Sequence, residues 1–431
     1  MQGIVMGLST NLHSTLKSIG RKIKWGAIHY YNAIGLYYFI SQHRKRVLKK
    51  ARSGKTINVL FLLQYPEMWN SEKSVYEAML SGETFHPMIV TVPKQKGVNH
   101  SNYQFMEANE ASLFCEKQDL PFFDGCENGV WKDIGELAPD FIFAQRPYDE
   151  CMPEHLALKE LSKAGIVCYI PYGYDFSDIH FPIEYNINFF NSVSCYFADS
   201  SDSYRYVCSK YIFDSILGIR RSFDLGYPRF DLVRALAEDV DHRTTVLWIP
   251  RWSIDEANDR SYFFDYLELL ISYFESRPEK KLIIRPHPLM FKNFVEKGVM
   301  TSDQVDLLMK RINSYQNISF DNNSDYLQTF EGSDLMISDF SSLMIEFFVS
   351  LKPIIFCGEN VEYYTNIGKE MMEGIYTVRN GDELTYRIDS LMNQYNEYYE
   401  RNKKMISSIF NPSISIGQSI AQTIAKTYLE R

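Results

Sequence analysis

The stretch Ile57-Asn58-Val59-Leu60-Phe61-Leu62-Leu63 decides the fold, because six of its seven residues are apolar and none is charged. A short apolar run of this kind predicts a strand buried on both faces, as the strands of parallel sheets are. A polar segment and a helical pattern at 74–80 follow, and the next strand-like run is 88–92. This order of strand, helix and strand indicates the first unit of a parallel α/β sheet.

The same alternation continues through the chain with one interruption. In the first half, strands are predicted at 140–144, 167–170 and 194–198, and helices at 153–164 and 200–211. Turn residues and a charged segment break the pattern at 215–243. In the second half, strands are predicted at 245–249, 281–284, 318–320, 335–338 and 353–356, and helices at 261–276, 302–313, 382–407 and 415–429. We therefore predict an α/β fold of two alternating units that face a cleft.

Composition excludes several classes of protein. The 431 residues are 45% hydrophobic and 23% charged, which is ordinary for a globular chain and excludes a mostly disordered one. The seven cysteines are scattered and form no C-x-x-C pair, so zinc-ribbon and thioredoxin-type sites are excluded and a reduced, cytosolic setting is favoured. No H-E-x-x-H or phosphate-binding glycine loop occurs, and we predict no metal site.

The charges are distributed unevenly along the chain. Eleven of the 45 Lys and Arg residues lie in residues 1–55, whereas all 54 Asp and Glu residues follow that segment. An acidic body argues against a nucleic-acid partner. Residues 1–55 also carry a helical apolar stripe, which consists of Ile4, Leu8, Leu12, Leu16, Ile19 and Ile23.

We interpret residues 1–55 as a basic amphipathic helical arm on an anionic membrane surface. The protein would then be peripheral, at the cytoplasmic face of the cell membrane. Two alternatives remain open: the uncharged segment 25–43 could span the bilayer, or the arm could pack on the protein body.

Ligands of parallel α/β sheets bind where strands end, and three loops stand out there. The first is Arg285-Pro286-His287-Pro288, in which two prolines fix the backbone around an imidazole that can bind phosphate. Arg285 adds a planar fork that suits phosphate or carboxylate. A turn whose histidine only bonds locally is the alternative.

The second loop is Ser338-Asp339-Phe340-Ser341-Ser342, between a strand and a helix. Serine hydroxyls and free N–H groups at a helix start predict an anion cradle. Glu346, one turn further on, could accept hydrogen bonds from ribose. Simple helix capping by Asp339 or Ser341 is the alternative.

The third loop, 169–176, follows a strand of the first half and should face the same cleft. Asp175, Asp178 and His180 are its candidate bases. Arg229 and Arg251 lie in turns near the junction of the two halves, where each either clamps a diphosphate or is only a surface charge.

Taken together, these motifs resemble the CDP-glycerol glycerophosphotransferase family, whose members build teichoic acids and related capsular polymers. The resemblance rests on 285–288, on 338–342 with Glu346, and on Lys352-Pro353-Ile354-Ile355-Phe356. The segments 226–231 and 249–252 look like two further family segments. The similarity covers residues 160–410.

The resemblance implies a GT-B-like fold of two Rossmann-type domains. It implies a membrane-contact arm at 1–55, an acceptor-side domain at 56–235, a domain for the CDP-polyol donor at 236–410, and a helix at 411–431 that packs back across the domains. His287 would be catalytic and face the donor phosphates. The diphosphate would be bound by Arg285, Ser341, Ser342, Arg251 and Arg229, and the nucleotide by Glu346 and Asp339.

The sequence departs from the family at one position. Many members carry an H-G-T-like segment whose histidine is a candidate base, but here the stretch reads Pro171-Tyr172-Gly173-Tyr174. Tyrosine, with an unperturbed pKa of about 10, is a poor base at neutral pH. Either Asp175 or His180 takes over, or the base is not essential.

The predicted function is transfer of glycerol phosphate, or another polyol phosphate, from a CDP-polyol. The acceptor is a hydroxyl of a membrane-linked glycan or polyol-phosphate chain, CMP leaves, and no cofactor is expected. Two alternatives are a GT-B glycosyltransferase that uses a nucleotide sugar, such as a CMP-sugar, and a non-catalytic membrane-associated assembly protein.

Overall fold

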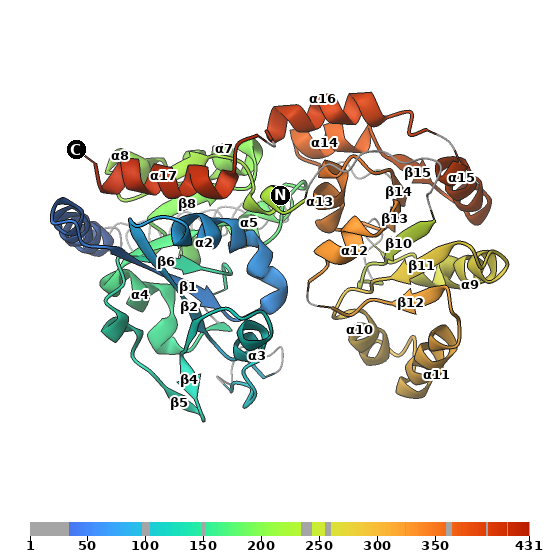
Figure 1. Cartoon of the computed structure of the whole chain (residues 1–431), viewed down its shortest axis with the longest axis horizontal. Helices are drawn as coiled ribbons and strands as arrows, with labels where there is room; N and C mark the ends of the chain where they lie inside the picture. The colour runs from blue at the N-terminus through green and yellow to red at the C-terminus, as the bar shows by residue number, and fades with distance from the viewer. Residues whose placement is uncertain are drawn as a thin grey trace, which may run out of the picture.

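The structure, a computed structural model, has two α/β lobes (Figure 1). It describes residues 34–96, 104–148, 151–233, 244–254, 260–323, 325–358, 364–393, 395–411 and 413–430. The apolar stripe at 4–23 lies outside these residues.

A seven-stranded parallel sheet forms the centre of the N-terminal lobe. In spatial order its strands are β3 (Phe122–Asp124), β2 (Phe85–Thr91), β1 (Ile57–Leu63), β6 (Phe141–Ala144), β7 (Ile166–Tyr169), β8 (Cys195–Ala198) and β9 (Arg221–Asp224). Alternate residues of β1 enter two different cores: Phe61 packs on one face and Leu62 on the other. Both faces are covered, which explains why the run at 57–63 is apolar throughout.

A six-stranded parallel sheet forms the centre of the C-terminal lobe. In spatial order its strands are β12 (Ile318–Phe320), β11 (Lys281–Ile284), β10 (Thr245–Ile249), β13 (Leu335–Ser338), β14 (Ile354–Cys357) and β15 (Tyr376–Val378). In β10, Trp248 belongs to a core cluster with α9, and Leu247 belongs to the cluster on the other face. The predicted alternating α/β class is therefore confirmed.

Helices cover both sheets. Those of the N-terminal lobe include α2 (Lys73–Leu80), α3 (Glu110–Lys117), α4 (Leu158–Ala164), α5 (Phe181–Glu184), α7 (Ser201–Lys210) and α8 (Ile212–Ile216). Those of the C-terminal lobe include α9 (Phe263–Glu275), α10 (Met290–Glu296), α11 (Ser302–Asn313), α12 (Leu327–Glu331), α13 (Leu343–Val349), α14 (Asn366–Met372), α15 (Gly381–Asn393) and α16 (Tyr399–Ile409).

Each sheet has a point where the strand order reverses. In the N-terminal lobe the chain goes from β1 to β2 on one side and later returns to β6 on the other side. In the C-terminal lobe the same happens at β10, which has β11 on one side and β13 on the other. Such switch points open a crevice at the carboxyl ends of the strands, where α/β proteins bind ligands.

The last helix, α17 (Ile416–Tyr428), follows the C-terminal lobe in the chain but lies on the N-terminal lobe beside α2 (Figure 1). Asp231, in the 3₁₀ helix η5 (Pro228–Asp231), accepts hydrogen bonds from the backbone N–H groups of Ile416 (2.9 Å) and Gly417 (2.8 Å). A side chain at Gly417 would collide with the carbonyl of Ser74, so glycine permits the close approach of α17 to α2. The predicted boundary at 235 lies outside the described residues, and the domain limits stay predictions.

The predicted helix 382–407 was wrong as a single element, because α15 and α16 are separate. Asn396 lies between them, and its Oδ1 accepts hydrogen bonds from Tyr376 Oη (3.0 Å) and from the N–H of Tyr398 (3.1 Å). The amide thus ties the connection to β15.

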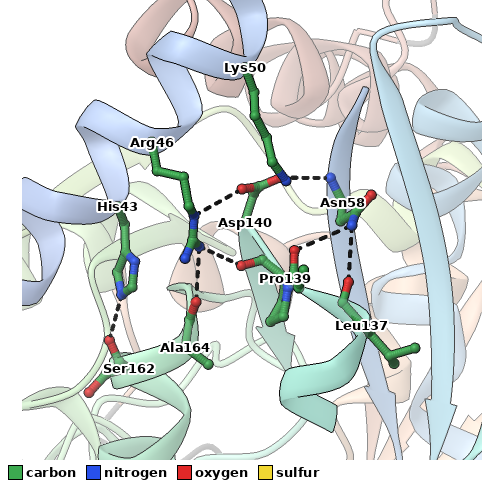
Figure 2. A network of polar contacts seen from close by, with 10 residues as sticks. His43, Arg46, Lys50, Asn58, Leu137, Pro139, Asp140, Ser162 and Ala164 are labelled. Atoms are coloured by element: carbon green, nitrogen blue, oxygen red, sulfur yellow. Dashed lines mark hydrogen bonds and ion pairs between the residues drawn. The ribbon is translucent and has the colours of Figure 1, made fainter. Parts of the chain in front are cut away.

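Residues 34–52 form a helix that packs on the N-terminal lobe (Figure 2). Lys50 Nζ lies 2.6 Å from Asp140 Oδ2, and Arg46 donates to the carbonyls of Pro139 (2.6 Å) and Ala164 (2.9 Å). His43 Nε2 lies 3.0 Å from the carbonyl of Ser162. For Arg46 and Lys50 the expectation of a membrane contact is corrected, because these cations bind the protein body. None of the described helices is long and apolar enough to cross a membrane.

Candidate active site

The two C-terminal motifs meet at the reversal point of their sheet. Arg251 follows β10, His287 follows β11 and Ser341 follows β13, and the spatial order of the strands is β11-β10-β13. Two strand spacings separate β11 from β13, so the outer loops begin about 10 Å apart. The loop after β10 lies between them.

Asp339 holds this group of loops together. Its Oδ2 accepts hydrogen bonds from the N–H groups of Arg251 (2.9 Å) and Tyr262 (3.0 Å) and from Ser261 Oγ (3.3 Å). Burial raises the pKa of Asp339 to about 7. A carboxyl used in this way shapes the crevice, so the geometry favours a positioning role over the predicted contact with a nucleotide.

Arg251 lies on the middle loop, which follows β10. Its Nη1 donates to the carbonyl of Phe340 (3.1 Å), and its guanidinium lies 5.2 Å from the centre of the Phe340 ring. These contacts turn Arg251 toward the loop that carries Ser341 and Ser342.

His287 enters the crevice as a neutral ring. The Leu289 N–H donates to His287 Nδ1 (3.1 Å), and the Trp252 ring lies 6.0 Å away. His287 is exposed, but the protein atoms around its ring and then the charge of Arg251 lower its pKa to about 4. Because Nδ1 is an acceptor, the single proton is on Nε2, which can donate a hydrogen bond but brings no charge. Binding of donor phosphate by His287 stays a prediction, with Nε2–H as the donor.

Ser341 and Ser342 precede α13. Ser341 Oγ accepts a hydrogen bond from the Leu343 N–H (3.3 Å), which is the capping role weighed above. The Ser342 side chain is exposed. Both hydroxyls remain able to donate to an anion.

Arg285 is engaged by the protein itself. Its Nη1 lies 2.6 Å from Asp321 Oδ2, and its Nη2 donates to the carbonyl of Asn323 (2.7 Å). These contacts tie the end of β11 to the segment after β12. Binding of donor phosphate by Arg285 stays a prediction.

Arg229 and Glu346 form a buried ion pair between η5 and α13, with 2.9 Å between Nη1 and Oε1. Tyr326 Oη donates to the other carboxylate oxygen of Glu346 and accepts from Arg229 (2.8 Å). Glu346 is fully buried and Arg229 nearly so. Neither side chain is presented to a ligand, so the geometry favours a structural joint over the predicted donor contacts.

The loop after β7 in the N-terminal lobe reaches the serine loop of the other lobe. The Phe176 ring lies 4.9 Å from the Phe340 ring, and a Cβ built on Gly173 would lie 3.6 Å from Ser342 Oγ. The Thr365 N–H donates to the carbonyl of Phe176 (2.9 Å), which adds a backbone contact between the lobes. Two of the three predicted loops therefore touch.

Asp175 and His180 lie at this contact. Asp175 Oδ1 is 3.5 Å from His180 Nδ1, and the His180 ring lies 6.3 Å from the ring of Phe340. Tyr172, at the position of the family histidine, is close to Tyr148, with 3.4 Å between the two hydroxyl oxygens. Burial raises the pKa of Tyr172 well above its ordinary value, so it stays protonated.

A buried carboxyl that the motifs did not reveal, Glu184 on α5, completes this group. Burial, together with the charge of Asp175 and a hydrogen bond with it, raises the pKa of Glu184 well above its ordinary value. The raised pKa favours the protonated form of Glu184, whose side chain supports Asp175. Its position four residues after His180 on a helix was the signal that could have found it. In the described part of the chain, no group of three or more His, Cys, Asp or Glu side chains is arranged to hold a metal ion.

The fold has known counterparts. A structure of the wall teichoic acid polymerase TagF is 16% identical, with a TM-score of 0.52, over 91% of this chain and 98% of that one. The UDP-GlcNAc 2-epimerase of Neisseria meningitidis, bound to UDP-GlcNAc, is 13% identical, with a TM-score of 0.52, over 86% of this chain and 100% of that one. The chain thus has the predicted GT-B-like fold.

The sequence narrows the class to one family. Residues 196–413, half of the chain, match the family of CDP-Glycerol:Poly(glycerophosphate) glycerophosphotransferase, and this chain belongs to that family. The teichoic acid poly(glycerol phosphate) polymerase of Staphylococcus epidermidis is 24% identical over 238 residues, which are 49% of this chain. The chain spans only 30% of the length of that curated relative.

Proposed function

We propose that this protein transfers glycerol phosphate from CDP-glycerol to a hydroxyl of a polyol-phosphate or lipid-linked glycan acceptor and releases CMP. Family membership supports the reaction class. The observation that carries the proposal is the convergence of Arg251, His287 and the Ser341–Ser342 pair around one crevice, next to the loop of the opposite lobe.

The C-terminal crevice is the proposed donor site. Arg251 supplies positive charge, and the Nε2–H of His287 and the serine hydroxyls supply hydrogen bonds to the diphosphate. Fixed donors of this kind stabilise charge that develops on the transferring phosphoryl group. The nucleotide contacts proposed for Glu346 and Asp339 are replaced here by structural roles that fit their burial.

His180 is the proposed base, and Asp175 orients it. A hydrogen bond from Nδ1 to the Asp175 carboxylate leaves Nε2 able to accept the proton of the acceptor hydroxyl. The distance of 3.5 Å is long, as catalytic hydrogen bonds often are before substrate binds. The pair lies beside Phe340, so it is next to the donor loop.

The reaction follows from these positions. The acceptor oxygen attacks the phosphorus that bears glycerol, its proton goes to His180, and a new phosphodiester bond forms. The bond between the two donor phosphates breaks, and CMP leaves with its electron pair, stabilised by Arg251 and His287. Holding both reactants in line provides much of the rate.

A membrane-linked acceptor requires a surface that reaches lipid, and one edge of the N-terminal lobe offers it. Exposed apolar side chains occur on α8 and on the neighbouring 34–52 helix; this apolar edge consists of Ile34, Tyr37, Tyr38, Ile212, Phe213, Ile216 and Leu217. The two helices are linked by Arg44, which donates to the carbonyl of Gly218 (2.9 Å). Lys45, Lys49 and Arg52 are exposed on the same helix. Apolar groups with nearby cations suit the surface of an anionic bilayer, which we take to be the cytoplasmic leaflet.

The test follows the phosphorus atom. CDP-glycerol labelled with ³²P in the phosphate that bears glycerol is incubated with the full-length protein and a glycerol-phosphate primer. Label in the primer product, with unlabelled CMP released, is expected. Label that stays with the nucleotide while the glycerol or another polyol moves would overturn the proposal in favour of glycosyl-type transfer. No turnover and no nucleotide binding would favour a non-catalytic assembly protein.

A further inference from the structure

The N-terminal lobe has its own crevice at the point where its strand order reverses. A small recess lies between the ends of β1 and β6. Its lining includes apolar side chains such as Leu62, Met152 and Leu158, together with Arg146 and Tyr148. It is the counterpart, in the other sheet, of the crevice that contains Arg251.

Arg146 is a cation that lines this recess. Its guanidinium lies 4.1 Å from the centre of the Tyr65 ring and 4.9 Å from that of Tyr148. Its Nε and Nη1 atoms are buried, and in the described part of the chain neither has a hydrogen-bond partner. Buried polar groups are normally satisfied, so these two donors of one guanidinium can serve a ligand.

Lys94, a second cation near the Tyr65 ring, differs from Arg146 because it has carboxylate partners. Lys94 Nζ lies 5.1 Å from the centre of the Tyr65 ring, but it is bound by Glu110 (2.7 Å) and by Glu67 (3.3 Å). Within the described residues Arg146 has no such carboxylate partner. Unlike Lys94, Arg146 is thus not paired with a carboxylate of the described part of the chain.

A chain of contacts leads from Arg146 to the proposed reaction centre. Its neighbour Tyr148 is 3.4 Å from Tyr172, measured between the hydroxyl oxygens. Tyr172 adjoins Gly173, which lies against Ser342 of the donor loop. The proposed base, His180, lies on the same side of this contact, beside Phe340.

We propose that Arg146 binds a phosphate group of the acceptor, so that the acceptor is a polyol phosphate or another phosphate-bearing chain. This inference rests on the function proposed above and specifies its acceptor. A planar guanidinium fixed between two aromatic rings presents paired N–H groups, which match two oxygens of a phosphate. Held there, the acceptor places a terminal hydroxyl toward His180, and the donor phosphates stay in the other lobe.

The test measures phosphate binding directly in the full-length protein. sn-Glycerol 3-phosphate is the soluble probe, titrated by calorimetry with the donor crevice filled by CMP, and CDP-glycerol is titrated separately. The variants are Arg146→Gln, Arg146→Lys and the matched control Arg277→Gln. Arg277 also stacks on a tyrosine, at 4.0 Å from the Tyr273 ring, but it lies at the end of α9 in the other lobe. Thermal melting of each variant checks that it folds.

Arg146→Gln is expected to weaken binding of glycerol 3-phosphate at least about tenfold, the size of a lost charged hydrogen bond, with little change for CDP-glycerol. The affinity of Arg146→Lys for glycerol 3-phosphate should lie between those of the wild type and Arg146→Gln, because lysine keeps the charge but lacks the planar pair of N–H groups. Arg277→Gln should match the wild type. The same order should appear in KM for a glycerol-phosphate primer.

Unchanged binding of glycerol 3-phosphate by folded Arg146→Gln would overturn the inference. An equal loss for CDP-glycerol would also overturn it, because Arg146 would then belong to the donor site. A wild type that binds glycerol 3-phosphate through Arg146 but never binds CDP-glycerol would refute the donor proposal and leave this site standing. The two failures are therefore distinguishable.

Discussion

The two lobes have the same architecture, but different side chains lie at the points where the strand order of each sheet reverses. In the C-terminal lobe, Asp339 shapes the loops, and Arg251, the neutral His287 and two serines form the proposed diphosphate site. In the N-terminal lobe, the crevice holds Arg146, which has no carboxylate partner among the described residues, and the nearby loop contributes Asp175 and His180. The comparison teaches that the fold supplies the crevice, whereas the side chains after each strand decide between leaving-group stabilisation and acceptor activation.

Removing His287 should have the largest effect on activity. His287→Ala is expected to lower kcat by roughly 10²–10³, because one fixed donor to the developing charge is lost. The fold should survive, since the ring reaches solvent. His86→Ala, at an exposed position on β2, is the matched control and should keep full activity. Full turnover by His287→Ala would remove the donor crevice from the mechanism.

The joint between the lobes can be broken at Glu346. Glu346→Leu leaves Arg229 buried without its partner, so the free energy of unfolding should fall by about 3–5 kcal/mol in urea titrations. The exposed pair of Arg260 and Asp265 (2.7 Å) is the control, and Asp265→Leu should cost less than about 1 kcal/mol. Equal losses in the two variants would show that the buried pair is not a joint.

The acceptor side is tested at His180. His180→Ala should lower kcat by roughly 10², and Asp175→Asn should lower it less, because the base remains but is oriented less well. CDP-glycerol should bind both variants normally. Asp178, the third candidate base, is exposed, and Asp178→Asn is expected to turn over like the wild type. If His180→Ala turns over like the wild type, the base lies elsewhere.

The protonation state of His287 can be tested by varying the pH. With a pKa of about 4, its ring stays neutral from pH 5 to pH 8, because protonation occurs only as the pH falls toward 4. ¹⁵N spectra of the free protein should show one proton, on Nε2, across that range. A ring that titrates near its ordinary value of 6.5 would contradict this environment.

The smallest effect is expected at the apolar edge. Ile216→Glu should reduce sedimentation with anionic vesicles about tenfold, because an exposed apolar anchor becomes a carboxylate next to negative lipid. Leu307→Glu, at an exposed site on α11 in the other lobe, should not change it. Identical sedimentation of the two variants would exclude α8 from the membrane surface.

The sequence predicted the alternating elements well, because strands buried on both faces give apolar runs that need no tertiary information. The burial of Glu346 could not be predicted, since it depends on Arg229 more than a hundred residues away in the chain. Nor could the packing of Arg46 and Lys50 on Asp140 be predicted, because a cation-rich helix looks the same beside a carboxylate or a membrane. The sequence could have revealed Arg146, because it comes two residues after β6, as Arg251 comes two residues after β10.

The central claim is that one crevice, lined by His287 and the serine pair, binds the donor diphosphate. Calorimetric titration of CDP-glycerol into wild type, His287→Ala, the double variant Ser341→Ala/Ser342→Ala and Arg146→Gln tests it directly. We expect at least tenfold weaker binding in the first two variants, as for lost hydrogen bonds to a charged group, and wild-type binding in Arg146→Gln. Undiminished affinity in both C-terminal variants would contradict the account.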